Sequence, residues 1–211
     1  MSEFFLNKSS QPKNPFPVIE AEQADGRRLR SSRSKQRIIT AMFELLAEGD
    51  MTPSAVDVAA RAKVGMRTVF RHFKDMDKIY NEMALELSEA VMPMITAPYE
   101  TTAWRDRLFE CLEKRAELYE IVFPMKLCLT IRRFQSRFLE EQHQRDISYL
   151  RSALQTILPD EILNDRDVFG AIEAALDFST WRQLRQDQER SVESAKKSIQ
   201  LTLQGLIRDI D

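Results

Sequence analysis

The side chains best suited to chemistry lie within residues 66–74. Their spacing predicts a short helix of about two turns in which Val69 and Phe73 pack inward. Its N-terminal end and opposite face then carry side chains that can bond to DNA: Met66, Arg67, Thr68, Arg71 and His72, with the basic Lys74 directly after it. Arg67 is the candidate for base recognition, because its guanidinium fork can donate two hydrogen bonds to guanine in the major groove.

Further candidates for phosphate binding precede this helix. Residues 27–37 contain six basic side chains and no acidic one. Arg33 and Lys35 belong to this run, and residues 27–35 (RRLRSSRSK) are suited to the adjacent minor groove, where basic arms of other DNA-binding proteins lie. Ser54 stands at the start of a predicted helix, where its hydroxyl and the free amides around it can bind phosphate.

Each of these candidates also has a plainer interpretation. An arginine on a short helix is often only solvated, which applies to Arg67 and to Arg71. His72 taken alone is more typical of a packed interface histidine than of a DNA contact. A basic run before a helix is often a flexible tail. DNA binding is favoured because several candidates share one predicted helix.

Catalysis and metal binding find little support in the sequence. The two histidines are His72 and His143. Glu140, His143 and Asp146 form a single row at intervals of three residues, whereas a metal site would draw ligands from more than one element. We therefore predict no catalytic residue, no metal site and no cofactor.

Composition limits the fold class. Of the 211 residues, 5 are glycine and 43% are hydrophobic. Glycine is the residue that takes a positive φ freely, and its scarcity argues against glycine-rich phosphate loops and β-sandwiches. An all-helical chain is therefore favoured. No apolar stretch is long enough to cross a bilayer, so we expect no membrane partner. Cys111 and Cys128 lie in apolar helical patterns without a CxxC motif, which indicates reduced core thiols of a cytoplasmic protein.

The formal charge of −2 conceals an uneven distribution. Residues 27–78 contain 12 basic and 6 acidic side chains, whereas residues 79–211 contain 17 basic and 23 acidic ones. A surface that meets the phosphates of DNA needs an excess of cations. The basic third is therefore the part expected to touch DNA.

This basic third is predicted to form three helices. The first has apolar residues at three- and four-residue spacing between residues 38 and 45, and ends before Gly49. Thr52 followed by Pro53 indicates the start of the second, and Gly65 marks the break before the third. A longer helix followed by two short helices joined by a tight turn is the arrangement of a helix-turn-helix DNA-binding domain.

Residues 37–79 resemble the DNA-binding region of the tetracycline-repressor-like (TetR) family of transcriptional regulators. The resemblance rests on the strings RIITAMFELLAEG, TPSAVDVAARAKV and GMRTVFRHFKDMDKI, and above all on Thr68, Phe70, His72 and Phe73. It implies that Thr68, Phe70 and His72 contact the DNA backbone and base methyl groups. The family usually has Tyr where this chain has Phe70, so a hydroxyl contact to phosphate is lost, although the ring can pack against sugar or a thymine methyl.

The acidic remainder of the chain is predicted to be helical and fits the variable regulatory domain of that family. Proline and apolar spacing divide it into helices expected over residues 76–92, 104–122, 125–131, 134–157, 168–186 and 192–210. We therefore predict an all-α chain with three parts. They are a flexible, basic-ended arm (1–30), a three-helix helix-turn-helix DNA-binding domain (31–78), and a helical ligand-binding and dimerisation domain (79–211).

Two groups of apolar residues in the third part exceed the needs of one core stripe. The family places its inducer pocket among helices that correspond to those carrying the first group: Trp104, Phe109, Met125, Leu129, Phe134 and Phe138. The second group gives the last two helices more than one apolar face, which favours a two-fold interface with a second copy: Ala171, Phe178, Trp181, Ile199, Leu203 and Leu206. The alternatives are ordinary core packing for the first group and a fully internal helix for the second.

The sequence thus predicts a dimeric, ligand-responsive transcriptional regulator, in the simplest case a repressor. It would bind a palindromic double-stranded DNA operator and be released by a small, apolar effector. Two other classes stay open. One is a helical DNA-binding protein controlled by a protein or DNA partner, and the other is a helical enzyme or scaffold that does not bind DNA.

Overall fold

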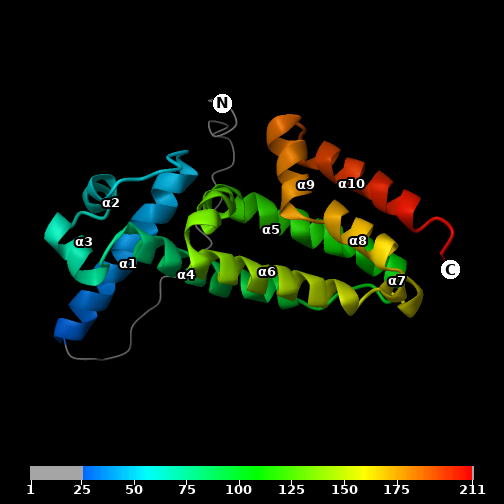
Figure 1. Cartoon of the computed structure of the whole chain (residues 1–211), viewed down its shortest axis with the longest axis horizontal. Coiled ribbons are helices and arrows are strands. Elements are labelled where there is room, and N and C mark those ends of the chain that lie inside the picture. The colour runs from blue at the N-terminus through cyan, green and yellow to red at the C-terminus, as the bar shows by residue number, and fades with distance from the viewer. Residues whose placement is uncertain (1–25, 211) are drawn as a thin grey trace. The chain divides into compact units, whose positions relative to one another are not determined.

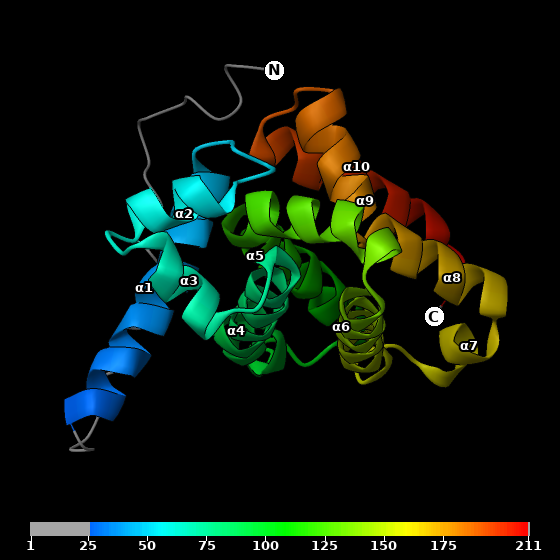
Figure 2. The ribbon, with the colours of Figure 1, turned by 60° about the vertical axis from the view of Figure 1, so that its left-hand side comes forward.

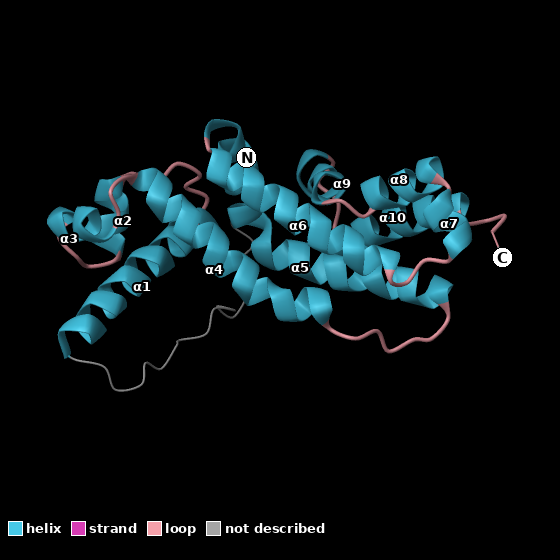
Figure 3. Cartoon of the chain, turned by 60° about the horizontal axis from the view of Figure 1, so that its bottom comes forward, coloured by secondary structure: helices cyan, strands magenta, loops and turns pink. Residues whose placement is uncertain are grey.

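The computed structural model describes residues 26–210. Within that range the regular elements are all helical and no strand occurs (Figure 3), which confirms the predicted all-α class. In chain order (Figure 1) they are α1 (Gly26–Ala47), α2 (Ala55–Arg61), α3 (Met66–His72), α4 (Met76–Thr96), α5 (Trp104–Arg132), the 3₁₀ turn η1 (Arg133–Gln135), α6 (Arg137–Gln155), α7 (Asp160–Asn164), α8 (Arg166–Ala175), α9 (Phe178–Arg182), the π-helical turn η2 (Gln183–Asp187) and α10 (Val192–Leu206). No helix of the described part is long and apolar enough to span a membrane.

The chain forms two compact units. Unit 1 consists of the described residues up to Ala90 together with Pro124–Gln144, and unit 2 consists of Val91–Phe123 and the described residues from Arg145 onward. These units do not coincide with the predicted boundary at residue 78, because the first part of α4 and the middle of the chain group with the N-terminal helices. Helices α4, α5 and α6 each contribute residues to both units.

The first helix starts earlier than the sequence suggests. α1 begins at Gly26, so residues 26–30, which we assigned to the flexible arm, are helical. The basic stretch 27–35 likewise belongs to α1 and does not form an extended arm. The rest of the predicted arm, residues 1–25, lies outside the described part of the chain.

In unit 1, helices α1, α2 and α3 pack against one another (Figure 2). Ile38 and Met42 of α1, Val58 of α2 and Val69 of α3 are each 0% exposed, and Phe73 is buried directly after α3. The burial of each such side chain stabilises the fold by roughly 1.5–3 kcal/mol. Val69 and Phe73 therefore hold α3 by one face, as predicted, and leave its other face outward.

The loop after α1 depends on a glycine, as the sequence predicts. Gly49 has φ 96°, a conformation that glycine adopts without steric cost. Its amide donates to the carbonyl of Leu46 and the Asp50 amide donates to the carbonyl of Leu45, each at 3.0 Å. This pair of hydrogen bonds is the Schellman motif that ends helices.

The predicted start of the second helix is wrong by two residues. Ser54, rather than Thr52, is the N-cap of α2. The Asp57 amide donates to the Ser54 hydroxyl (3.2 Å), and the Ser54 amide donates to the Asp57 carboxylate (3.1 Å). This reciprocal capping box satisfies two free amides, whereas the Thr52 amide is taken by Asp50 at 3.1 Å.

The turn between α2 and α3 is closed without a glycine. Lys63 has φ 53°, its amide donates to the carbonyl of Ala60 (3.1 Å), and the Val64 amide donates to the carbonyl of Ala59 (3.0 Å). Gly65 adopts an ordinary extended conformation and serves as the N-cap of α3. The residue that takes the unfavourable left-handed conformation is therefore a lysine.

Three predicted helix boundaries in the remainder are also wrong. Pro93 lies within α4 and Pro124 lies within α5, so neither proline ends its helix. A proline removes one main-chain hydrogen bond, and both helices continue despite that loss. The predicted helix over residues 168–186 is broken at Asp177, whose carboxylate caps α9 by accepting a hydrogen bond from the Ser179 amide at 2.8 Å.

Replacing Lys63 by glycine is expected to stabilise the protein. Glycine removes the steric cost of the left-handed conformation, so the free energy of unfolding should rise by about 0.5–1 kcal/mol in urea titrations. Lys63→Ala is the matched control, since alanine removes the charge and keeps a Cβ. Equal stability of the glycine and alanine variants would show that the turn carries no such strain.

Candidate nucleic-acid interface

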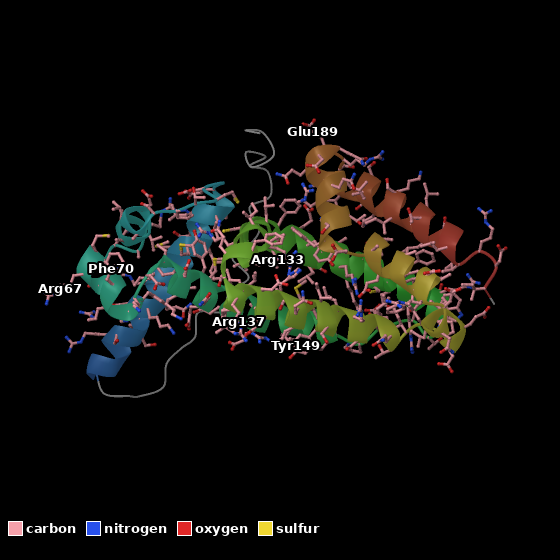
Figure 4. All side chains as sticks on the ribbon, in the orientation of Figure 1. Arg67, Phe70, Arg133, Arg137, Tyr149 and Glu189 are labelled. Atoms are coloured by element: carbon pink, nitrogen blue, oxygen red, sulfur yellow. The ribbon has the colours of Figure 1, made fainter. Side chains whose placement is uncertain are left out.

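The outward face of α3, together with the residue that follows the helix at position 74, brings together five of the ten predicted DNA contacts. Met66 and Phe70 are 36% and 48% exposed, and Arg67, Arg71 and Lys74 are exposed as well. Residues at intervals of three and four share one side of a helix. Figure 4 shows Arg67 and Phe70 projecting from the outer side of α3. This side therefore presents three cations around an aromatic ring.

The three cations on this face make no internal ion pair. Within the described residues, no carboxylate pairs with Arg67, Arg71 or Lys74. Arg61 of α2 differs, since it pairs with Glu48 at 2.5 Å. The charges of Arg67, Arg71 and Lys74 are thus not neutralised by any carboxylate in residues 26–210.

His72 and Thr68 lie closer to the packed side of α3. Both are half-buried, and the His72 Nε2 atom is buried without a hydrogen-bond partner among the described residues. Burial, together with the positive charges of Arg71 and Lys35, lowers the pKa of His72 below its usual 6.5. The imidazole is therefore neutral at pH 7, and its position matches the packed interface histidine of the plainer interpretation.

The two basic candidates on α1 have different surroundings. Arg33 is exposed, whereas the Lys35 ammonium forms an ion pair with Glu82 of α4. The neighbouring Gln36 amide donates to the Glu86 carboxylate at 2.9 Å. Arg33 is therefore the more accessible cation, and Lys35 connects α1 to α4 within unit 1.

The Ser54 hydroxyl is already engaged. It donates to the Asp57 carboxylate and accepts from the Asp57 amide. Hydrogen bonds from the Ser54 hydroxyl and amide lower the pKa of Asp57, so this carboxylate is ionised at the start of α2. A phosphate at this position would have to displace Asp57 from Ser54 and approach a negative charge.

Arg37 is a positioning residue that the sequence reasoning did not single out. Its guanidinium, on α1, donates from Nη2 to the carbonyl oxygen of Lys63 (2.6 Å) and to that of Ala62. These carbonyls belong to the turn between α2 and α3, so Arg37 fixes the turn that aims α3. The only sequence signal was its place in the basic run of residues 27–37.

The six predicted effector contacts do not fall in one unit. Trp104 and Phe109 are half-buried residues of unit 2. The other four belong to unit 1, where Met125 is buried, Leu129 and Phe138 are half-buried, and Phe134 is 76% exposed. The structure therefore divides the six predicted effector contacts between the two units.

Four of the six predicted dimer contacts are buried inside unit 2: Phe178, Trp181, Ile199 and Leu203. Phe178 packs edge to face against Tyr119 and Phe123, and the Trp181 indole donates to Glu120 at 2.9 Å. These four side chains are therefore packed inside unit 2, as expected for a fully internal helix, the alternative to a dimer contact. Ala171 and Leu206 are half-buried.

The exposed faces of α8 and α10 have small side chains. Gly170 and Ala174 are exposed on α8, and Gly205 is exposed on α10, where Leu201 is 62% exposed. A Cβ added at either glycine would meet nothing within 4 Å. Nothing within the described chain therefore requires glycine at these two helical positions.

A buried arginine is the main polar feature of unit 2. Arg115 of α5 is 6% exposed, and its guanidinium donates to the carbonyl oxygens of Leu176 (3.1 Å) and Leu150 (2.8 Å). The Tyr119 hydroxyl donates to the same Leu176 oxygen at 3.0 Å. Sequence reasoning missed Arg115 because it stands in a mixed, charged stretch of a long helix.

Among the described residues, no group of three or more His, Cys, Asp or Glu side chains could hold a metal ion.

Comparison with known proteins identifies the fold. No protein-family model matches the sequence, and no curated protein matches it. A transcriptional regulator from Rhodococcus sp. RHA1 superposes with a TM-score of 0.63 at 13% identity, over 84% of this chain and 96% of that one. A protein described as a TetR-family transcriptional regulator, from Mesorhizobium loti, gives 0.58 at 15% identity, over 85% and 97%. A TetR transcriptional regulator from Rhodococcus sp. RHA1 gives 0.52 at 13%, over 86% and 99%.

These similarities show a common fold. The chain has the fold of TetR-family transcriptional regulators, as the resemblance of residues 37–79 led us to expect.

The lowered pKa of His72 predicts a pH dependence of stability. The unfolded chain takes up a proton as the pH falls below about 6.5, whereas folded His72 resists protonation, so the free energy of unfolding should decline from pH 6.5 downward. In His72→Gln this part of the decline should disappear from urea titrations at pH 7.5 to 5. His143→Gln controls for the loss of an imidazole, and an unchanged pH profile in His72→Gln would contradict the assignment.

Proposed function

We propose that this chain is a transcriptional regulator that binds a palindromic DNA operator as a homodimer through α2 and α3, and that a small-molecule effector releases it. One observation carries the proposal: Arg67, Phe70 and Arg71 of α3 and the following Lys74 are all exposed, and among the described residues no carboxylate pairs with these three cations. The TetR-type fold supports it, because this fold places a helix-turn-helix at the same part of the chain.

The chemistry of this face divides base reading from backbone binding. Arg67, near the N-terminal end of α3, can donate two hydrogen bonds to guanine. Arg71 and Lys74 supply positive charge for phosphates, and the Phe70 ring can pack against sugar or a thymine methyl. The excess of basic side chains in residues 27–78 attracts DNA to this part of the protein over a longer range.

A palindromic operator requires two copies related by a two-fold axis. The exposed faces of α8 and α10 are suited to this contact. Glycine within a helix costs roughly 0.5–1 kcal/mol relative to alanine. Gly170 and Gly205 have open space around them in the single chain, so the close approach of a second copy would explain them. Ala174 and the exposed Leu201 would add apolar contact area.

Release by an effector would operate through helices shared by both units. α4 follows directly after the helix-turn-helix, is tied to α1 by Lys35 and Glu82, and continues into unit 2. An effector that binds one arrangement of the unit 2 helices more tightly shifts the population toward it. Repression relieved by the effector is the simplest regulatory outcome.

Substitutions on α3 test the DNA-binding face. Fragments of the source genome that bind the protein are selected and used in fluorescence anisotropy titrations. Arg67→Ala should weaken binding by about 5- to 150-fold and relax the preference for guanine at one position. Arg71→Ala should weaken binding to all sequences and lower the slope of log affinity against log salt by about 1. Arg137→Ala removes a cation whose side chain is 93% exposed on α6 and should bind as the parent does. Parent-like affinity in both α3 variants would refute the assignment.

A charge placed on the α8 and α10 face tests the dimer. Gly205→Lys should convert the dimer to a monomer in sedimentation velocity, because an ammonium would be buried against a second copy. Lysine favours helix more than glycine does, so the variant chain should still fold. Gln200→Lys places the same charge on another exposed side of α10 and should leave the dimer intact. Dissociation by both variants, or by neither, would count against this interface.

A further inference from the structure

Two prolines of the described chain lie where helices pass from one compact unit to the other. α4 belongs to unit 1 up to Ala90 and to unit 2 from Val91, and it contains Pro93. α5 belongs to unit 2 up to Phe123 and to unit 1 from Pro124. Each proline therefore lies at, or within one helical turn of, the position at which its helix changes unit.

The bonding partners of α4 change across Pro93. On the unit 1 side, the Glu82 carboxylate forms an ion pair with Lys35 of α1. On the unit 2 side, the Lys114 ammonium of α5 donates to the carbonyl oxygen of Ala97, directly after α4, at 3.2 Å. The two ends of α4 are thus held by side chains of different units.

The partners of α5 change across Pro124 in the same way. Before the proline, the Phe123 ring packs edge to face against Phe178 of α9, with the ring centroids 5.4 Å apart, and both rings belong to unit 2. After the proline, the Cys128 thiol donates to the carbonyl oxygen of Met51, in the loop between α1 and α2, at 3.6 Å. The part of α5 that follows Pro124 is therefore bound to the helix-turn-helix side of the chain.

A proline within a helix weakens the helix at that point. Because proline has no amide hydrogen, Pro93 cannot donate to the carbonyl oxygen of Glu89, and Pro124 cannot donate to that of Glu120. The ring also crowds this carbonyl, which is why sharp bends in helices are found mainly at prolines. Pro93 is exposed and Pro124 is half-buried, so core packing does not explain the choice of proline at either position. A need for the helix to bend would explain both.

We propose that α4 and α5 bend at Pro93 and Pro124, and that this paired hinge is the route by which unit 2 regulates DNA binding by unit 1, a role that rests on the proposed function. Bending at these positions leaves the contacts on either side intact, because the partners of each helix change there. Hinges are formed by a few residues that absorb the change in backbone angles. α6, the third helix shared by both units, contains no proline and remains a continuous connection.

Distances measured within one full-length chain test the hinge. Spin labels are attached through Ala60→Cys on α2 and Ser152→Cys on α6, two exposed positions in different units, and labelled chains are mixed with an excess of unlabelled ones. The two natural cysteines are buried and stay in place. Double electron–electron resonance without DNA should give a broad distance distribution for this parent. Adding Pro93→Ala and Pro124→Ala together restores both hydrogen bonds and should reduce the width of the distribution to about half or less.

A third proline provides the matched control. Pro98 is exposed and lies in the segment between α4 and α5, outside both helices, so Pro98→Ala should keep the broad distribution. Alanine favours helix far more than proline does, so the double variant should fold, which circular dichroism checks. A parent distribution as narrow as that of the double variant would show two static kinks and overturn the hinge. Equal narrowing by Pro98→Ala would also overturn it.

Fluorescence anisotropy on a selected genomic fragment tests the regulatory role. The double variant should change DNA affinity about fivefold or more, because stiff helices favour one of the arrangements that the parent samples. Pro98→Ala should bind as the parent does. A narrowed distribution with parent-like affinity would overturn the regulatory role. If the distances narrow as expected and no fragment is bound, the hinge stands and the proposed function fails. If DNA is bound and the double variant keeps the broad distribution, the proposed function stands and the hinge fails.

Discussion

The hydrogen bonds from Arg37 to the carbonyl oxygens of Ala62 and Lys63 are the constraint on which the candidate interface depends. They tie the carbonyl of the α2 C-cap residue, Ala62, and that of the left-handed Lys63 to the long helix α1. Val69 and Phe73 then hold α3 against the same core by burial of apolar surface. Polar ties and apolar burial together fix which face of α3 looks outward, and that face carries the cations.

Arginine plays a related part in both units, with different consequences. Arg37 is exposed, so water shares the solvation of its charge, and its hydrogen bonds to helix-end carbonyls cost little desolvation. Arg115 makes the same kind of hydrogen bonds to Leu150 and Leu176, but it does so in the buried interior of unit 2. There the guanidinium is held by these two carbonyls and by the Cys111 side chain, so it ties α5 to α6 and to the end of α8.

Much of the fold could be predicted because local signals agreed with tertiary packing. Gly49 identified the end of α1, since the Schellman turn there requires a left-handed residue and glycine adopts that conformation most easily. The turn closed by Lys63 could not be read in this way, because lysine rarely takes such a conformation. The helix ends predicted at Pro93 and Pro124 were wrong, because a long, packed helix can tolerate the loss of one main-chain hydrogen bond.

The candidate site was predicted in part for similar reasons. Helical periodicity separates inward from outward residues, so Val69 and Phe73 were placed correctly in the core. Periodicity does not reveal the partner of a polar side chain. It therefore gave no sign that Glu82 engages Lys35 or that Asp57 engages Ser54. Nor can it tell an internal helix from an interface, which is why Trp181 entered the predicted dimer contact.

The central claim is that two α3 helices, related by a two-fold axis, read two inverted half-sites of DNA. Hydroxyl-radical footprinting of genomic fragments selected by the full chain tests it most directly. The account predicts two protected half-sites of inverted sequence whose centres lie about 10 base pairs apart, or a multiple of that spacing. Protection of a single site without symmetry, or the failure of any fragment to be enriched, would contradict it.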